Sequence, residues 1–130
     1  NLYRFIYELK QTVIPAEAGI YKNKKWIPDQ VRDDKWIIGQ LNKTIKEVTK
    51  YLESFQLHLA TETLYDFIWH KFADVYVEKS KERRSEAQPT LEYIFENILK
   101  LLHPFMPFLT EDLWQKIDPG KSITTISWPS

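Results

Sequence analysis

The 130-residue chain contains no cysteine, and its three glycines lie far apart in the sequence. The missing cysteine excludes disulfides, thiolate metal sites and a cysteine nucleophile. The scattered glycines exclude a glycine-rich loop that wraps around a phosphate group. Apolar stretches are short as well, because none reaches the roughly 18 residues that a membrane-spanning helix needs. The sequence therefore predicts neither a phosphate-binding loop nor a transmembrane helix.

The chain also lacks a net charge, since 18 Lys and Arg residues balance 18 Asp and Glu residues. A strong stand-alone nucleic-acid binder usually carries a net basic domain, so nucleic-acid binding by this chain would require a local basic face. Apolar residues make up 43% and aromatic residues 15% of the sequence, which indicates one folded domain. The sequence starts at Asn1, with neither a methionine nor a basic signal peptide, and we expect a fragment of a larger chain.

Helical periodicity dominates the sequence. Apolar residues recur every three or four positions over residues 1–11, 35–53, 57–79, 90–102 and 110–117. This pattern predicts an all-α bundle of about four or five helices. The apolar arc of segment 57–79 is wide, which predicts that this helix is central. The short break before it predicts that it runs antiparallel to the preceding helix.

The boundaries of these helices are predicted from capping residues and prolines. The polar run 79–89 is interpreted as a solvated loop or a frayed helix end that finishes at Pro89, with Thr90 as the next helix cap. Thr110 is expected to cap the last helix, and the tail after Gly120 to be extended. Gly39 lies inside a predicted helix and lowers its helix preference by about 1 kcal/mol.

One region breaks the helical pattern. Residues 12–34 show no helical or strand period and contain Pro15, Gly19 and Pro28. A structureless stretch of this length is uncommon inside a compact domain and is typical of an insert or linker. We therefore divide the chain into a helix over 1–11, an irregular inserted segment over 12–34, and a helical bundle with a short extended tail over 35–130.

No titratable residues have the spacing of a catalytic or metal site. The histidines are scattered, at His58, His70 and His103. Adjacent acids lie at two predicted helix starts, as Asp33 with Asp34 and Glu111 with Asp112. Carboxylates at such positions stabilise the positive end of a helix. We therefore predict neither catalytic residues nor metal ligands in this chain.

Two basic groups are candidates for binding phosphates. Lys43, Lys46 and Lys50 are spaced by three and four, so they share one helix face opposite the apolar stripe. Ammonium groups contact nucleic-acid phosphates as point charges. A second group lies in the polar run, where neighbouring glutamates weaken the field, and consists of Lys79, Lys81, Arg83 and Arg84, with the two arginines as the preferred RNA contacts. A solvated helix surface is the alternative interpretation of both groups.

Aromatic residues could stack on unpaired bases if they are exposed. Most of them fall on apolar helix faces, where core packing is the simpler interpretation. Trp26 and Phe55 lie in predicted loops, and we expect them to be the exceptions.

The run Leu101–Ile117, LLHPFMPFLTEDLWQKI, resembles a distinctive segment of valyl-tRNA synthetases. Segment 62–81, ETLYDFIWHKFADVYVEKSK, is similar to a helix of the same family, although Val75 stands where the family usually has Trp. Segment 34–45, DKWIIGQLNKTI, looks like the stretch that opens the anticodon-binding bundle. The closing Trp128-Pro129 also fits, so the resemblance covers about residues 34–130 in order, and residues 1–9 more weakly.

The resemblance implies the anticodon-binding helix bundle of a class I aminoacyl-tRNA synthetase. The parent enzyme would join valine to its tRNA with ATP and Mg²⁺, and would lie in the cytoplasm. This chain lacks the ATP-binding signatures of the family, which implies a non-catalytic portion without a cofactor of its own. The implied partners are the anticodon arm of the valine tRNA and the parent's catalytic domain, with no membrane and no DNA.

Residues 12–34 do not match the family. The peptides VIPAEAGI and WIPDQVRDD resemble those produced when mobile palindromic repeats insert in frame into bacterial genes. Loop-closure entropy grows slowly with length, so such an insert need not unfold the domain. Two other interpretations remain open, namely a non-catalytic remnant of a split synthetase gene and a generic helical protein-interaction module.

Overall fold

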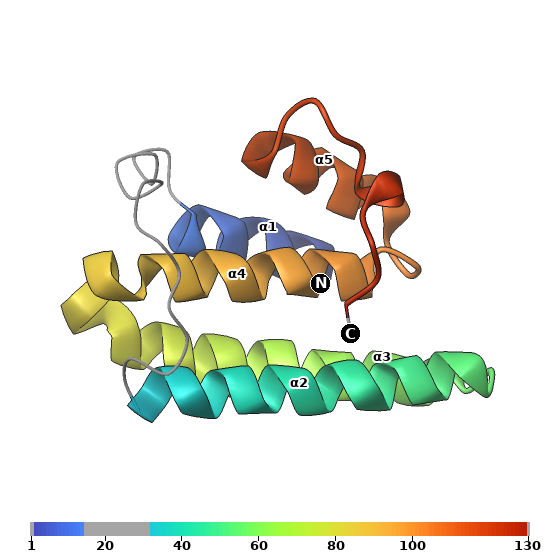
Figure 1. The fold of residues 1–130 in the computed structure, drawn as a ribbon, viewed down its shortest axis with the longest axis horizontal. Coiled ribbons are helices and arrows are strands. Elements are labelled where there is room, and N and C mark those ends of the chain that lie inside the picture. Colours follow the sequence, from blue (N-terminus) through green and yellow to red (C-terminus); the bar gives the residue numbers. More distant parts are fainter. Residues whose placement is uncertain (1, 15–31, 130) are drawn as a thin grey trace.

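The computed structural model describes residues 2–14 and 32–129, and these residues form helices without a strand (Figure 1). The α-helices are α1 (Leu2–Val13), α2 (Arg32–Glu53), α3 (Leu57–Asp66), α4 (Arg84–Leu102) and α5 (Pro107–Ile117). A π-helix, η2 (Phe67–Val77), continues α3, and two short 3₁₀ turns follow, η3 (Ser80–Arg83) and η4 (Ile123–Thr125). The predicted all-α class is therefore confirmed for the described residues.

The helices form layers around α4 (Figure 1). Helix α2 packs lengthwise against α3 and η2, as the predicted antiparallel pair. Helix α4 packs on α2 from one side and on α1 and α5 from the other. Its buried residues accordingly cover a wide arc, which includes Leu91, Ile94, Phe95, Ile98, Leu99 and Leu101, whereas Glu92, Glu96 and Lys100 on the remaining face are half-buried. The central helix is thus α4 and not segment 57–79, although that segment is contacted by more than one helix, as predicted, since α2 packs along it and Phe5 of α1 lies against Trp69.

The wide apolar arc of segment 57–79 has a different cause, which is the π-helix η2. Phe67, Phe72 and Tyr76 follow one another at steps of five and four, and all three are buried. An α-helix turns every 3.6 residues, so a step of five rotates a side chain away from the face. The i→i+5 turn of a π-helix keeps it there. The three rings therefore stack in series, with centroids 6.4 and 6.3 Å apart.

Of the two interpretations of residues 79–89, the solvated loop is wrong and the helix end is closer, because η3 and the first turns of α4 occupy this stretch. This stretch buries small and polar side chains, namely Ser80, Ala87 and Gln88. Gln88 Nε2 donates a hydrogen bond to the Val13 carbonyl at 2.7 Å, which ties α4 to the end of α1. A search for large apolar residues misses such a segment, and Pro89 lies inside α4 rather than before it.

Other boundaries shift by a few residues. Helix α1 extends to Val13, and α2 begins at Arg32 rather than near Lys35. The remainder of the predicted insert, residues 15–31, lies outside the described residues. Thr110 does not cap α5, which starts at Pro107 after Met106. Its hydroxyl instead bonds within the helix, to the Met106 carbonyl at 3.0 Å.

The tail is only partly extended, because Ile123–Thr125 forms the 3₁₀ turn η4 between extended residues at Ser122 and Ile126. The Ile123 backbone N–H donates to Glu111 Oε2 at 2.8 Å, which fixes this turn on α5. That hydrogen bond lowers the pKa of Glu111 below its usual value. The tail thereby leaves α5 in a defined direction, toward α2 (Figure 1).

No helix within residues 2–14 and 32–129 combines the length and the apolar character needed to cross a bilayer.

Candidate functional site

The predicted lysine stripe lies on the exposed face of α2. Lys43, Lys46 and Lys50 are all exposed, whereas the opposite face of the helix, with Ile37 and Leu41, is fully buried. Lys43 Nζ lies 4.0 Å from Glu47 Oε1, at the limit of an ion pair. Lys46 and Lys50 make no ion pair with any residue that the structure describes. The two ammonium groups at the C-terminal end of the stripe are thus available to an external anion.

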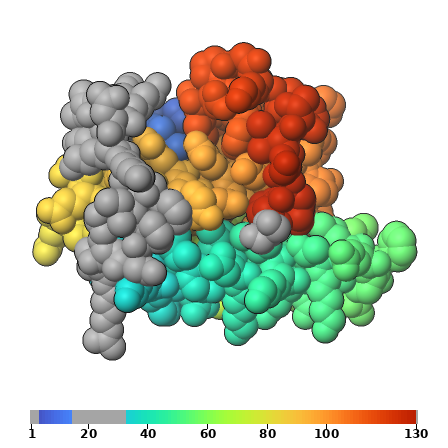
Figure 2. Space-filling view, viewed as in Figure 1, coloured from blue at the N-terminus to red at the C-terminus, as the bar shows by residue number. Residues whose placement is uncertain are grey.

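The C-terminal tail reaches α2 beside these lysines. Trp128 Nε1 donates a hydrogen bond to Thr49 Oγ1 at 2.8 Å, which joins residues 79 positions apart. Figure 2 shows the C-terminal segment, in red, descending from α5 onto the surface of α2. Thr49 lies directly before Lys50 in the sequence, so the indole is placed at the lysine stripe.

A groove of about 340 Å³ lies between the tail and α2. Its lining residues come from both elements: Ile45, Lys46, Thr49, Lys50, Glu53, Trp128 and Pro129. The groove therefore combines apolar side chains and one aromatic ring with two cations and one carboxylate. This composition suits a flat, partly apolar ligand that carries negative charge.

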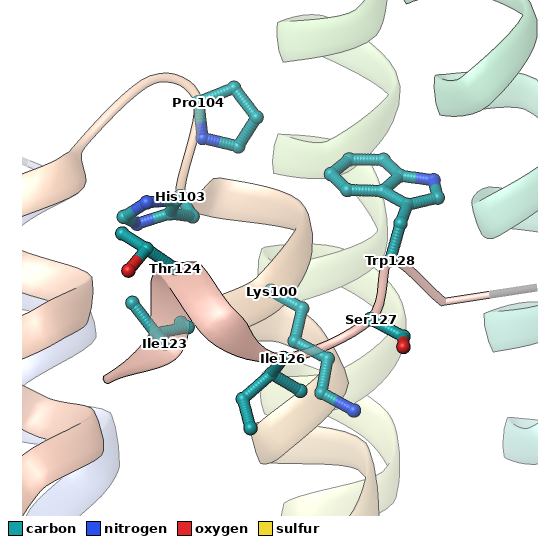
Figure 3. A pocket seen from close by; sticks show the side chains of 8 residues that line it. All are labelled: Lys100, His103, Pro104, Ile123, Thr124, Ile126, Ser127 and Trp128. Atoms are coloured by element: carbon teal, nitrogen blue, oxygen red, sulfur yellow. The ribbon is translucent and has the colours of Figure 1, made fainter. Parts of the chain in front are cut away.

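A smaller hollow of about 120 Å³ lies where the tail crosses the end of α4 (Figure 3). Trp128 and His103 lie at opposite sides of this hollow in the view, and Lys100 extends below the indole. His103 Nδ1 is 2.8 Å from Thr110 Oγ1, which gives this histidine a partner within the bundle. Trp128 lines both the hollow and the groove, so the same indole borders open space on two sides.

Arg83 and Arg84 are placed differently from the lysines, because their guanidinium groups are engaged inside the bundle. Arg83 Nη2 lies 2.7 Å from Asp34 Oδ1, and Tyr76 Oη donates to the same oxygen at 2.5 Å. Arg84 Nη2 donates to the Val77 carbonyl at 3.2 Å. Contact between these arginines and a nucleic acid would compete with the internal bonds.

The buried carboxylate of Asp34 was not predictable from its position. We expected a helix-start charge, and Asp34 does lie in the first turn of α2, but its side chain is only 4% exposed. Its partners stand 42 and 49 residues away, a distance that no local pattern reveals. Burial and the hydrogen bond to Asp34 raise the pKa of Tyr76 well above its usual value. Burial alone would lower the pKa of Arg83, but the hydrogen bond and charge of Asp34 raise it.

The two aromatic exceptions expected from the sequence have different outcomes. Phe55 is 89% exposed and has a φ of 59°, at the turn between α2 and α3. Trp26 lies outside the described residues. The exposure of Trp128, at 37%, was missed because a Trp-Pro pair in an extended tail carries no periodicity that places it on a helix.

Within the part of the chain that the structure describes, no three His, Cys, Asp or Glu side chains gather closely enough to hold a metal ion.

Residues 34–130 match the family described as the anticodon-binding domain of tRNA ligase. This match covers well over half of the sequence, so the chain belongs to that family. Similar curated proteins include valine–tRNA ligases from several bacteria.

The relative from Thermotoga maritima is 49% identical over 102 residues, that from Latilactobacillus sakei 43% over 105, and that from Aquifex aeolicus 39% over 118. These alignments include 74–75% of this chain but only 10–12% of each ligase. The sequence thus corresponds to a small part of the curated relatives that it matches.

Proposed function

We propose that this chain is the portion of a valine–tRNA ligase that binds the anticodon arm of its tRNA. The observation that carries the proposal is the exposed stripe of Lys43, Lys46 and Lys50, within a domain whose family is defined by anticodon binding. Phosphate contacts fix the register of a nucleic acid on a protein, and base contacts supply sequence specificity. The stripe would supply the first of these and would position the tRNA on the parent's catalytic domain.

The activity of the whole enzyme follows from the same proposal. The parent would attach valine to the tRNA with ATP and Mg²⁺ bound by its catalytic part, in the cytoplasm. In this portion, the described helices would serve binding alone. Arg83 and Arg84 are secondary candidates for RNA contact, and their internal hydrogen bonds favour a structural role.

Binding of the chain to a valine tRNA transcript and to an anticodon-swapped transcript, at two salt concentrations, tests the proposal. We expect tighter binding to the valine anticodon and weaker binding of both transcripts at higher salt. Equal affinity for the two transcripts would contradict anticodon recognition and would favour a remnant or a protein-interaction module.

The contribution of the lysines is tested by changing Lys43, Lys46 and Lys50 together to alanine. The dependence of log affinity on log salt should become shallower by about two, because each phosphate contact contributes about 0.7–0.9 to that slope. A matched variant changes Arg4, Lys116 and Lys121 to alanine, which removes the same charge from exposed positions outside α2 and outside both candidate groups. If both variants change the slope equally, the effect is one of net charge and the stripe is not the contact surface.

A further inference from the structure

We propose that the groove between α2 and the C-terminal tail holds one unpaired RNA base, stacked on Trp128, with the adjoining phosphates on Lys46 and Lys50. This inference rests on the proposed function and names a site for it. The proposed function requires a cationic surface, whereas this inference requires that a particular ring contact a base.

Trp128 is held in place while part of its surface remains open. Its Nε1 bond to Thr49 Oγ1 uses the only polar atom of the indole, and the residue is 37% exposed. The core aromatics differ clearly, since Phe72 is fully buried and Trp114 is 4% exposed. A ring that is already immobilised loses little conformational entropy when a ligand stacks on it.

The charges around the groove favour a nucleotide over other ligands. Lys46 and Lys50 lie one helical turn apart on the groove wall, and Glu53 is the one acidic residue among the lining residues. The resulting excess of positive charge suits a phosphate backbone. The open surface of the groove is mainly apolar, although Ile45 and Pro129 are themselves buried, and a base can cover such a surface whereas an isolated phosphate cannot. A base also offers amino groups, which can donate hydrogen bonds to the Glu53 carboxylate.

The position of the groove agrees with the lysine stripe. Lys46 and Lys50 belong to both, so a strand that follows the stripe along α2 passes the opening beside Trp128. Duplex RNA hides its bases within the stack, whereas a loop presents them unpaired. The occupant is therefore a nucleotide of a single-stranded loop.

The test measures binding of the chain to a fluorescently labelled RNA heptamer with the sequence of the valine anticodon loop, by fluorescence anisotropy. Trp128→Ala should weaken binding by about 5- to 150-fold, the range found for loss of one base–aromatic stack. Trp128→Phe should recover most of the affinity, since a phenyl ring also stacks. Trp36→Ala is the matched control, because Trp36 is 39% exposed and lies on α2 away from the groove.

An abasic heptamer separates stacking from a structural role of Trp128. It carries the phosphates but offers no base, so the wild type and Trp128→Ala should bind it equally. If Trp128→Ala weakens binding of the abasic and natural heptamers alike, the tryptophan acts by holding the tail and the inference is wrong.

The inference is also wrong if Trp128→Ala binds the natural heptamer as the wild type does, in which case another part of the parent protein is the better candidate for the groove. The proposed function survives that result as long as tRNA binding depends on the three lysines. If neither tRNA nor heptamer binds, the proposed function fails and the inference fails with it.

Discussion

At the scale of single residues, Asp34 illustrates how a charged side chain becomes part of a helical core. Its carboxylate accepts hydrogen bonds from Tyr76 of η2 and Arg83 of η3, so it joins the start of α2 to both elements. Arg83 remains 21% exposed, and water reaches the pair from that side. The arrangement fixes the end of the bundle, at the opposite end of α2 from Trp128.

Removing this charge should destabilise the fold. Asp34→Asn leaves Arg83 without its counter-ion and is expected to lower the free energy of unfolding by about 3 kcal/mol. The figure lies at the low end for a buried pair because Arg83 is partly solvated. Urea denaturation measures the change, and the neighbouring Asp33→Asn, which loses the same charge from a half-buried position, should cost about 0.5 kcal/mol or less. Equal losses in the two variants would contradict this account.

The raised pKa of Tyr76 predicts a loss of stability in alkali. Below about pH 10, tyrosine is neutral in both the folded and the unfolded chain, so its contribution is constant. Above that pH, the unfolded chain releases the proton first, and this residue lowers stability by up to about 1.4 kcal/mol per pH unit. Tyr76→Phe removes that component. At pH 7 the Tyr76→Phe variant should have a lower free energy of unfolding than the wild type, and this difference should shrink between pH 10 and pH 12 in urea titrations. Parallel curves of unfolding free energy against pH for the two proteins would show that Tyr76 ionises normally.

At the scale of elements, Gly39 is a weak point in the middle of α2. It is exposed, and a Cβ atom added there would meet nothing within 4 Å. Gly39→Ala should therefore stabilise the protein by about 1 kcal/mol, through the lower entropy of the unfolded chain and better helix preference. Gly120 is the contrasting control, since its φ of +96° disfavours a side chain even in open space. Gly120→Ala should destabilise by about 1 kcal/mol, and thermal melts of both variants measure the opposite signs.

The success of prediction from sequence also differs between elements. The buried apolar face of α2 was predictable because Ile37, Leu41 and Val48 repeat at α-helical spacing, and all three are buried. Helix α4 was predicted only after Pro89, since its first turns bury Ala87 and Gln88 instead of large apolar side chains. Segment 57–79 was misplaced because its apolar residues follow a π-helical repeat. Sequence periodicity therefore predicted the buried face of a helix correctly where that helix is a regular α-helix.

The candidate site was predictable in part for a related reason. Exposure of Lys43, Lys46 and Lys50 follows from the helix face alone, which sequence spacing reveals. The groove beside them depends on where the tail crosses α2, and the bond from Trp128 to Thr49 spans 79 residues. Such a long-range contact is set by the packing of α4 and α5 between the two segments. Sequence spacing therefore cannot predict this contact.

At the scale of the whole molecule, α1 closes the core although the family match begins only at residue 34. It packs on α4 and α5, and the Phe5 ring lies against Trp69 of η2 in a tilted arrangement, with ring centroids 4.3 Å apart. Ile6 and Val13 are completely buried. The helix thus contacts three elements of the bundle, and we infer that it folds with them as one cooperative unit rather than as a separate segment.

Ile6→Ala tests this cooperativity. A cavity under α1 is expected to cost about 3 kcal/mol, and if α1 belongs to the cooperative unit the whole transition moves to lower urea with an unchanged slope. Amide exchange should then show the same loss of protection in α1 and in α4. Arg4→Ala, at an exposed position in the same helix, should change stability by less than about 0.5 kcal/mol. If exchange accelerates in α1 alone, the helix opens independently, and the bundle over residues 32–129 must be stable without it.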